Sequence, residues 1–68
     1  MGEDMYVVEK IVDVGIFDGI VKFKVRWKGY KADEDTWEPE ENLESAPLAL
    51  NKFFVTNPKK VARVRQSI

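Results

Sequence analysis

The chain has 68 residues and a formal net charge of −1, and it contains neither cysteine nor histidine. This length allows one small domain, because a second core would bury too little apolar surface to offset the entropy of ordering the chain. The missing residue types exclude disulfide bridges, cysteine nucleophiles, histidine bases and nearly all zinc sites, so we expect a binding module that is not an enzyme and needs no metal or cofactor.

Two strands are predicted in the first half of the chain, over residues 6–14 and from Ile20 to the glycine at position 29. Between them, Asp18-Gly19 is a pair preferred in two-residue hairpin turns, where both central residues need positive φ. In the second strand apolar residues alternate with basic ones: Val21, Phe23, Val25 and Trp27 against Lys22, Lys24, Arg26 and Lys28. This period of two predicts one face in the core and one in solvent.

The second half predicts a loop, a short strand and a helix. Residues 31–35 are charged and loop-like, and residues 36–38 form a third strand that Pro39 ends. Ser45 is suited to cap a helix with Pro47 in its first turn, and Asn57-Pro58 ends that helix. Its apolar positions are expected to pack on the sheet: Leu48, Leu50, Phe53 and Phe54. The fold class is therefore α+β, mainly β, with a three-stranded antiparallel sheet packed against a C-terminal helix.

Charge divides the chain into an acidic body and a basic tail. All 12 acidic residues precede Pro58, and the last ten residues hold four cations: Lys59, Lys60, Arg63 and Arg65. An acidic body suits a cationic ligand such as a Lys/Arg-rich peptide. The tail offers a weak contact to nucleic acid phosphates, although a solvated or frayed terminus is the simpler interpretation. Whether the tail extends the helix stays open.

The location of the protein is predicted from two absences in the sequence. No apolar run approaches the roughly 20 residues that span a bilayer. The first four residues, Met1-Gly2-Glu3-Asp4, lack the basic and apolar regions of a signal peptide. We therefore expect a soluble intracellular protein without a membrane partner.

Three aromatic residues lie where a strand meets a loop, namely Tyr6, Trp27 and Tyr30. A hairpin brings the start of its first strand beside the end of its second, so Tyr6 and Trp27 should meet, and Tyr30 can turn back toward them. Such a cluster often only caps a core. Here the next loop adds carboxylates, Asp33, Glu34 and Asp35. Rings and carboxylates together suit a quaternary ammonium ion, and methylated lysine is the obvious candidate.

Three spaced blocks carry a resemblance to a known family: Tyr6-Val7-Val8-Glu9-Lys10-Ile11, Val25-Arg26-Trp27-Lys28-Gly29-Tyr30 and Asp35-Thr36-Trp37-Glu38-Pro39-Glu40-Glu41-Asn42-Leu43. Over residues 6–54 the chain resembles the chromodomain family. The resemblance implies a curved sheet with a C-terminal helix, a nuclear and chromatin-associated protein, and a reader of a methylated histone three tail. It divides the chain into an N-terminal segment 1–5 that orders on peptide binding, a chromodomain 6–57 and a basic tail 58–68.

The resemblance also implies the site. The methyllysine cage would be Tyr6, Trp27 and Tyr30, assisted by Glu34. The peptide would enter as an extra strand between residues 4–8 and residues 42–45, with contacts from Met5, Val7, Val8, Glu38, Asn42 and Glu44. Val8 would line a small pocket for the alanine two residues before the methyllysine, while Glu38 and Asn42 would hydrogen-bond the peptide. Trp37 is expected to pack under the sheet as a structural residue outside the cage.

Within the family, the chain is most similar to the heterochromatin protein one type, which reads a lysine in an Ala-Arg-Lys-Ser context. The lysine-nine type of histone three site is favoured over the lysine-twenty-seven type. Polycomb-type domains clasp the peptide with apolar residues, and the mixed clasp of Met5 and Glu44 leaves this preference open, as it does di- against trimethyl preference. Two alternatives are a chromo shadow domain that dimerises through its helix and a nucleic acid binder. We expect a monomer.

Overall fold

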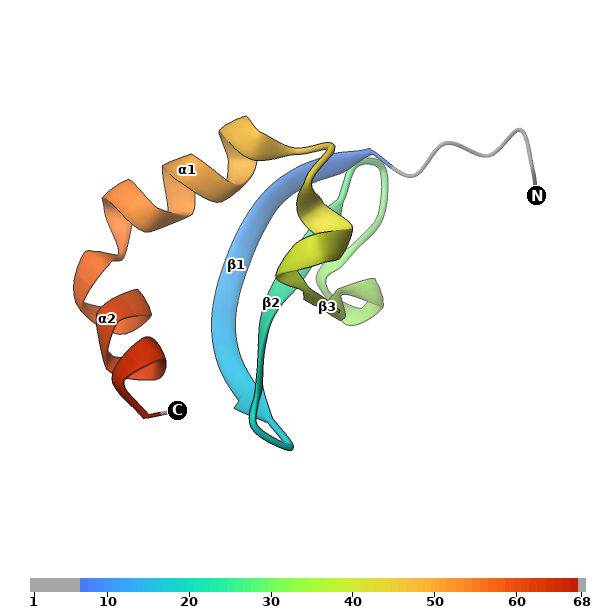
Figure 1. Ribbon diagram of the computed structural model, residues 1–68. Coiled ribbons are helices and arrows are strands. Elements are labelled where there is room, and N and C mark those ends of the chain that lie inside the picture. The colour runs from blue at the N-terminus through green and yellow to red at the C-terminus, as the bar shows by residue number, and fades with distance from the viewer. Residues whose placement is uncertain (1–6, 68) are drawn as a thin grey trace.

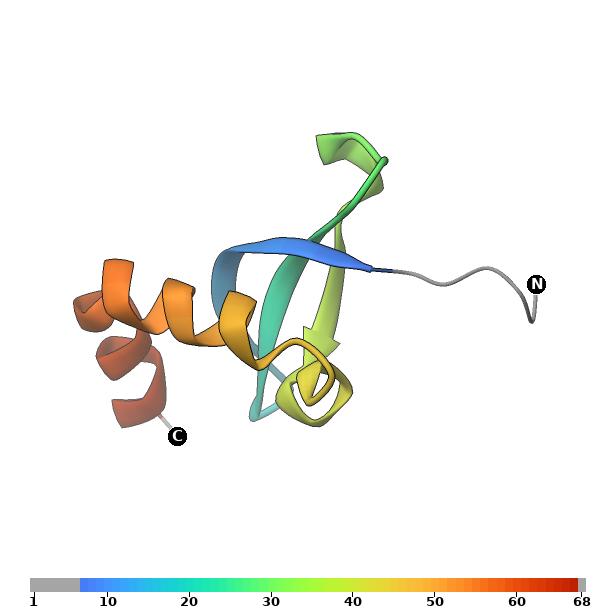
Figure 2. The same ribbon diagram turned by 90° about the horizontal axis from the view of Figure 1, so that it is seen from above.

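The computed structural model describes residues 7–67 and shows a small sheet with two helices against it (Figure 1). The elements are β1 (Val8–Phe17), β2 (Ile20–Trp27), η1 (Ala32–Glu34), β3 (Thr36–Pro39), η2 (Glu40–Leu43), α1 (Pro47–Thr56) and α2 (Pro58–Gln66), where η denotes a 3₁₀ turn. The strands form one antiparallel sheet in the order β1-β2-β3. Both helices contact β1 and lie on one side of the sheet (Figure 2). The predicted α+β fold class is confirmed.

The Asp18-Gly19 turn forms as predicted. Asp18 has a φ of 54° and Gly19 a φ of 79°, and the flanking Phe17 and Ile20 pair directly across the hairpin. Two positive φ values match a turn whose twist suits the strands on either side. Because a two-residue loop holds the strands together up to the turn, β1 continues to Phe17 instead of ending at position 14.

Two extra residues interrupt the pairing of β1 with β2. Val8 pairs with Trp27 and the next partners are Lys10 and Arg26, so Glu9 is unmatched, and Val12 is unmatched further along. Such bulges bend a strand and increase its twist, in agreement with the strong curvature of β1 in Figure 1. They also let Ile11 and Val14, three positions apart, both turn into the core.

The core lies between the sheet and the helices. Phe23 and Val25 of β2 are fully buried, which confirms the predicted alternation. The Phe23 ring centroid lies 6.3 Å from that of Phe53 and 5.8 Å from that of Phe54. The other buried residues are Ile11 and Val14 of β1, Leu43 of η2, Phe53 of α1 and Val61 of α2. We call this side of the sheet the inner face and the opposite side the outer face.

Two expectations about α1 are wrong. Leu48 is 84% exposed and not in the core, because the helix turns Ala49, Leu50 and Phe53 toward the sheet and so points Leu48 outward. Ser45 does not cap the helix. The N-cap is Ala46, which makes no side-chain cap hydrogen bond, so the helix begins one residue later than the cap prediction required.

The expected frayed terminus is also wrong for the part of the tail that the structure describes. Residues 58–66 form α2, in which Val61 is buried and Val64 is partly buried against the core. Lys60 forms an ion pair with Asp13 of β1, and Arg65 reaches Glu40 at 3.4 Å. Among residues 7–67, no helix is long and apolar enough to cross a membrane.

Trp37 packs on the sheet but not in the core. It pairs with Lys24, whose side chain belongs to the outer face, and its ring centroid lies 4.8 Å from that of Phe17. Trp37 therefore packs on the face of the sheet opposite the helices.

Candidate functional site

A tight turn after β2 brings two aromatic residues together. The Tyr30 amide donates a hydrogen bond to the Trp27 carbonyl over 3.0 Å, and Gly29 between them has a φ of 86°. A positive φ at the third position of such a turn favours glycine. The reversal places Tyr30 beside Trp27, and both line a pocket of about 440 Å³, the aromatic pocket, together with Glu34, Thr36 and Glu38.

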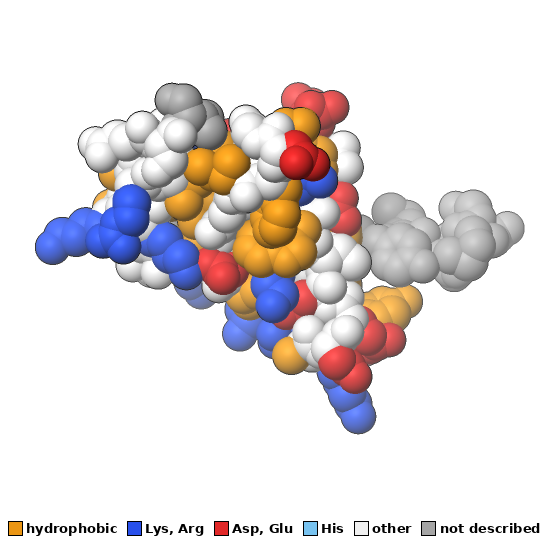
Figure 3. All heavy atoms as spheres, turned by 90° about the horizontal axis from the view of Figure 1, so that it is seen from below, with side chains coloured by type: hydrophobic (Ala, Val, Ile, Leu, Met, Phe, Trp, Pro, Cys, Tyr) orange, Lys and Arg blue, Asp and Glu red, His pale blue; other side chains and the backbone are white. Residues whose placement is uncertain are grey.

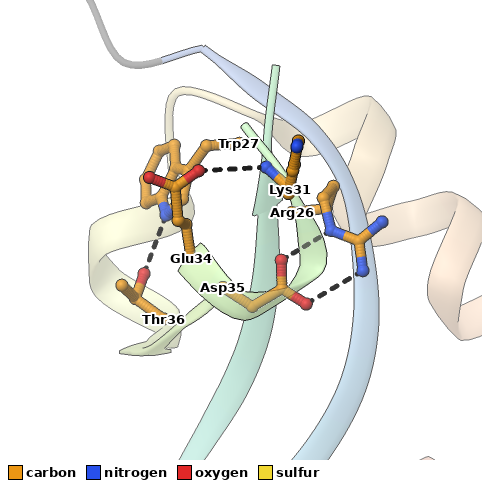
Figure 4. Close-up of polar contacts among 6 residues, drawn as sticks. All are labelled: Arg26, Trp27, Lys31, Glu34, Asp35 and Thr36. Atoms are coloured by element: carbon orange, nitrogen blue, oxygen red, sulfur yellow. Dashed lines mark hydrogen bonds and ion pairs between the residues drawn. The ribbon is translucent and has the colours of Figure 1, made fainter. Parts of the chain in front are cut away.

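The acidic side chain of this pocket is held by its own turn. The Glu34 amide donates to the Lys31 carbonyl over 2.9 Å, and the Lys31 amide donates to Glu34 Oε1 over 3.2 Å (Figure 4). The backbone and the side chain of Glu34 are thus both bonded to the backbone of Lys31, at the start of η1. The carboxylate is thus fixed at the pocket through Oε1, and within residues 7–67 its second oxygen has no hydrogen-bond donor.

Asp35, next in the chain, points away from the pocket toward Arg26. The Arg26 Nε–Asp35 Oδ1 distance is 2.6 Å and the Nη2–Oδ2 distance is 3.0 Å (Figure 4). The hydrogen bonds from Arg26 hold the pKa of Asp35 below its ordinary value, and those to Asp35 raise the pKa of Arg26. Of the three carboxylates expected near the rings, only Glu34 lines the pocket.

A chain of hydrogen bonds links the Trp27 ring to η2. Trp27 Nε1 donates to Thr36 Oγ1 over 2.8 Å, and Thr36 Oγ1 donates to Glu38 Oε2 over 2.8 Å. Asn42 Nδ2 donates to the other oxygen of Glu38 over 3.1 Å. Sequence reasoning missed Thr36, although its position two residues before Glu38 places both side chains on one face of β3.

The second candidate binding surface is an apolar groove of about 400 Å³. One wall is Val7 and Val8, and the other is formed by residues 45–49. The Lys28 amide donates to the Val7 carbonyl over 2.8 Å, so pairing with the segment after β2 extends to Val7, whose side chain is 49% exposed. Of the two strips predicted to flank the peptide, residues 4–8 and 42–45, the groove contains Val7 and Val8 of the first and Ser45 of the second.

The predicted site residues are distributed as follows. Trp27, Tyr30, Glu34 and Glu38 meet in the aromatic pocket, whereas Val7 and Val8 line the apolar groove. Asn42 and Glu44 are exposed, within and just after η2. Met5 and Tyr6 lie outside the described residues. In the described part of the chain, no cluster of acidic side chains is arranged to hold a metal ion.

The four cations of the predicted nucleic acid contact lie on α2, and two of them are paired within the domain. Lys60 and Arg65 have ion-pair partners in the body of the domain. Lys59, Lys60 and Arg63 line a cavity of about 630 Å³ where α1 meets α2.

Comparison with known proteins identifies relatives of this chain. It is 54% identical over 52 residues to M-phase phosphoprotein 8 of Homo sapiens, covering 76% of the chain and 6% of that protein. It is 48% identical over 46 residues to Heterochromatin protein 1 of Drosophila melanogaster, covering 68% of the chain and 22% of that protein. It is 38% identical over 65 residues to DNA (cytosine-5)-methyltransferase 3 of Zea mays, covering 88% of the chain and 7% of that enzyme.

The chain thus spans less than a tenth of the length of the first of these relatives, and matches one module within it. The matching family is described as the Chromo (chromatin organisation modifier) domain, and the match covers residues 6–55. Heterochromatin protein 1 is among the relatives, as the resemblance predicted. The chain therefore belongs to the chromodomain family of chromatin-associated nuclear proteins, whose module is a non-catalytic reader of methylated histone tails.

Proposed function

We propose that this domain binds a di- or trimethylated lysine of the histone three tail in a cage made of Tyr6, Trp27, Tyr30 and Glu34. The observation that carries this proposal is the aromatic pocket, in which two rings converge with the carboxylates of Glu34 and Glu38. Tyr6 lies outside the described residues, and we assign it the third wall because it precedes Val7, whose carbonyl accepts a hydrogen bond from the residue after Trp27.

The chemistry of this pocket favours a methylated ammonium over a free one. Methylation keeps the positive charge but weakens hydration, so less free energy is lost when water is removed. Each ring face contributes about 0.5 to 2 kcal/mol to binding a cation, and Glu34 adds an opposite charge. Two or three rings and one carboxylate are consistent with a dissociation constant in about the micromolar range.

The histone peptide would enter as an added strand between residues 4–8 and 42–45. The apolar groove beside Val7 and Val8 supports this proposal, since its apolar walls suit the methyl group of an alanine. Glu38 and Asn42 are already bonded to each other, which fixes both for hydrogen bonds to a peptide backbone. In this arrangement residues 1–5, with Met5, order on binding, and residues 6–57 hold the peptide.

For the identity of the site we propose an Ala-Arg-Lys-Ser context of the lysine-nine type. Glu44 is exposed directly after η2 and suits the polar half of a clasp over the peptide. Met5 would be its apolar half. The same peptide carries a basic residue beside the methyllysine, which agrees with the acidic body of this domain.

The test is a titration of fluorescent Ala-Arg-Lys-Ser peptides, unmethylated, dimethylated and trimethylated, followed by fluorescence polarisation. We expect binding of the methylated peptides, and loss of binding in Trp27→Ala and Tyr30→Ala proteins that circular dichroism shows to be folded. Trp37→Phe is the matched control, because its ring lies on the outer face. Equal binding of methylated and unmethylated peptides, or binding that survives Trp27→Ala, contradicts the cage. Light scattering at the same concentrations should give a monomer.

A further inference from the structure

The outer face of the sheet carries two rings and two lysines that the proposed peptide site does not use. Ile20, Lys22 and Lys24 alternate with the buried positions of β2, and their partners across the sheet share their side. We call this set the outer patch; its members are Phe17, Ile20, Lys22, Lys24 and Trp37. Hydrophobic side chains with basic side chains beside them are visible at the hairpin end of the molecule in Figure 3.

The two rings of the outer patch form an open aromatic surface. Their centroids are 4.8 Å apart and their planes are inclined at 58°. Phe17 is 40% exposed, and Ile20 opposite it is 53% exposed. Gly15 lies beneath them, and a Cβ there would come within 3.4 Å of the Phe17 ring and 3.6 Å of the Trp37 ring. Both rings therefore lie against the strand at Gly15, at distances where an added Cβ would make ordinary van der Waals contact.

A lysine ammonium group lies over each of the two rings. Lys22 Nζ lies 5.9 Å from the Phe17 centroid, and Lys24 Nζ lies 5.9 Å from the Trp37 centroid. Within residues 7–67 neither lysine belongs to an ion pair. Two cations that form no ion pair in this part of the chain lie over the two rings and are available to an anion that also carries aromatic groups.

The positive charge continues from the outer patch onto α2. Asp13 pairs with Lys24 in the sheet register and also holds Lys60 of α2. Lys24 and Lys60 therefore lie on either side of one carboxylate. Beyond Lys60, Lys59 and Arg63 line the cavity between the helices. The basic groups thus form a strip that is longer than the tail identified in the sequence.

We propose that the outer patch, extended by the cations of α2, binds single-stranded nucleic acid. Unpaired bases stack on Phe17 and Trp37, while Lys22 and Lys24 contact the phosphates. An acidic peptide would pair with the lysines but would not stack on the rings. A duplex hides the base faces that the rings need. Because the outer patch and the aromatic pocket lie on opposite faces of the sheet, the nucleic acid and a histone peptide bind together.

The charge part of this proposal is tested by fluorescence anisotropy with labelled single-stranded RNA, single-stranded DNA of the same sequence, and duplex DNA. The Lys22→Ala/Lys24→Ala protein should bind the single strands about tenfold more weakly, and the slope of log K against log salt should fall by about 1.4, the value for two phosphate contacts. The matched control is Lys28→Ala/Lys52→Ala, which removes the same charge from exposed positions elsewhere. The RNA and DNA arms show which sugar is preferred.

The stacking part is tested at Phe17. Phe17→Leu keeps apolar volume but removes the ring and should weaken binding of single strands about tenfold, whereas Phe17→Tyr should retain it. The proposal is overturned if no oligonucleotide binds, if duplex binds as well as single strands, or if Phe17→Leu has no effect and polyglutamate displaces the oligonucleotide equally well. None of these variants should change methylated-peptide affinity, so failure here and failure of the peptide proposal are distinguishable.

Discussion

Arg26 and Asp35 form a bidentate ion pair that attaches the turn before β3 to β2, the central strand of the sheet. The Asp35 side chain is 3% exposed, and its two oxygens face two different nitrogens of one guanidinium. Each residue is next in sequence to a residue of the aromatic pocket, Arg26 to Trp27 and Asp35 to Glu34. A contact outside the pocket therefore sets the separation between a ring and a carboxylate inside it.

This ion pair predicts a pH dependence of stability. The pKa of Asp35 lies below its ordinary value of 3.8 in the folded protein because of the hydrogen bonds from Arg26. The pair therefore stabilises the fold above about pH 4, and this contribution is lost as the pH falls through the lower, folded value. Asp35→Asn should lower the urea midpoint at pH 7 and weaken methylated-peptide binding, and its difference from the unmodified protein should shrink in acid.

The control for this prediction is Asp33→Asn, which removes the same charge from an exposed position without an ion pair in the described range 7–67. It should leave the midpoint nearly unchanged. A difference between Asp35→Asn and the unmodified protein that stays constant down to pH 2 would contradict the assigned role of the carboxylate.

Two glycines with positive φ allow stability to be separated from binding. Gly29→Ala and Gly19→Ala should each lower the free energy of unfolding by about 1 to 2 kcal/mol, because an added Cβ meets no atom within 4 Å at either site and only the backbone is strained. Only Gly29→Ala should also weaken peptide binding, since Gly29 turns Tyr30 toward Trp27. Urea denaturation and fluorescence polarisation measure the two effects. Equal peptide affinity in both variants would refute the role of this turn.

Thr36 is predicted to act as a positioning residue for the pocket. Thr36→Val keeps the shape of the side chain but removes the hydroxyl that accepts from Trp27 and donates to Glu38. Each such bond contributes about 1 kcal/mol to folding stability, so the melting temperature should fall, and methylated-peptide affinity should fall several-fold because the Trp27 ring is no longer held in place. Thr56→Val, on α1, is the matched control and should leave affinity unchanged. Full affinity in Thr36→Val would mean that Trp27 is held by packing alone.

Two leucines close in sequence should respond very differently to truncation. Leu43 is fully buried in η2, so Leu43→Ala should cost about 2 to 5 kcal/mol of unfolding free energy. Leu48 is 84% exposed on α1, and Leu48→Ala should change it by less than about 0.5 kcal/mol. Chemical denaturation of both proteins decides this. A large loss at Leu48 would show that the first turn of α1 has a partner in solution.

The parts of the fold that the sequence predicted correctly depend on local chemistry. Asp18-Gly19 determines a hairpin because few residue pairs accept two positive φ values, and alternation along β2 determines which side of the sheet is buried. What could not be predicted depends on contacts between distant residues. α2 is held by Val61 in the core and by Lys60 on Asp13, and neither contact can be inferred from the weak apolar stripe of the tail alone.

The candidate site was predicted to a similar extent. The rings of Trp27 and Tyr30 and the carboxylate of Glu34 meet as expected. Sequence position alone did not show that Glu34 would line the pocket and Asp35 would not. Asp35 points away because it pairs with Arg26 across the turn. The predicted roles of Tyr6 and Met5 remain predictions.

The bulges in β1 limit how the length of this strand can change. Glu9 and Val12 are each one residue too many for the ladder, and the residues on either side of each keep consecutive partners on β2. A deletion of either residue would therefore remove a bulge but leave Val8 opposite Trp27, on the same side of the sheet. A deletion of Gly15, in the regular part of the ladder, would instead shift Val14 by one position and turn it out of the core. Shortening of β1 should therefore be tolerated at the bulges and not near the hairpin turn.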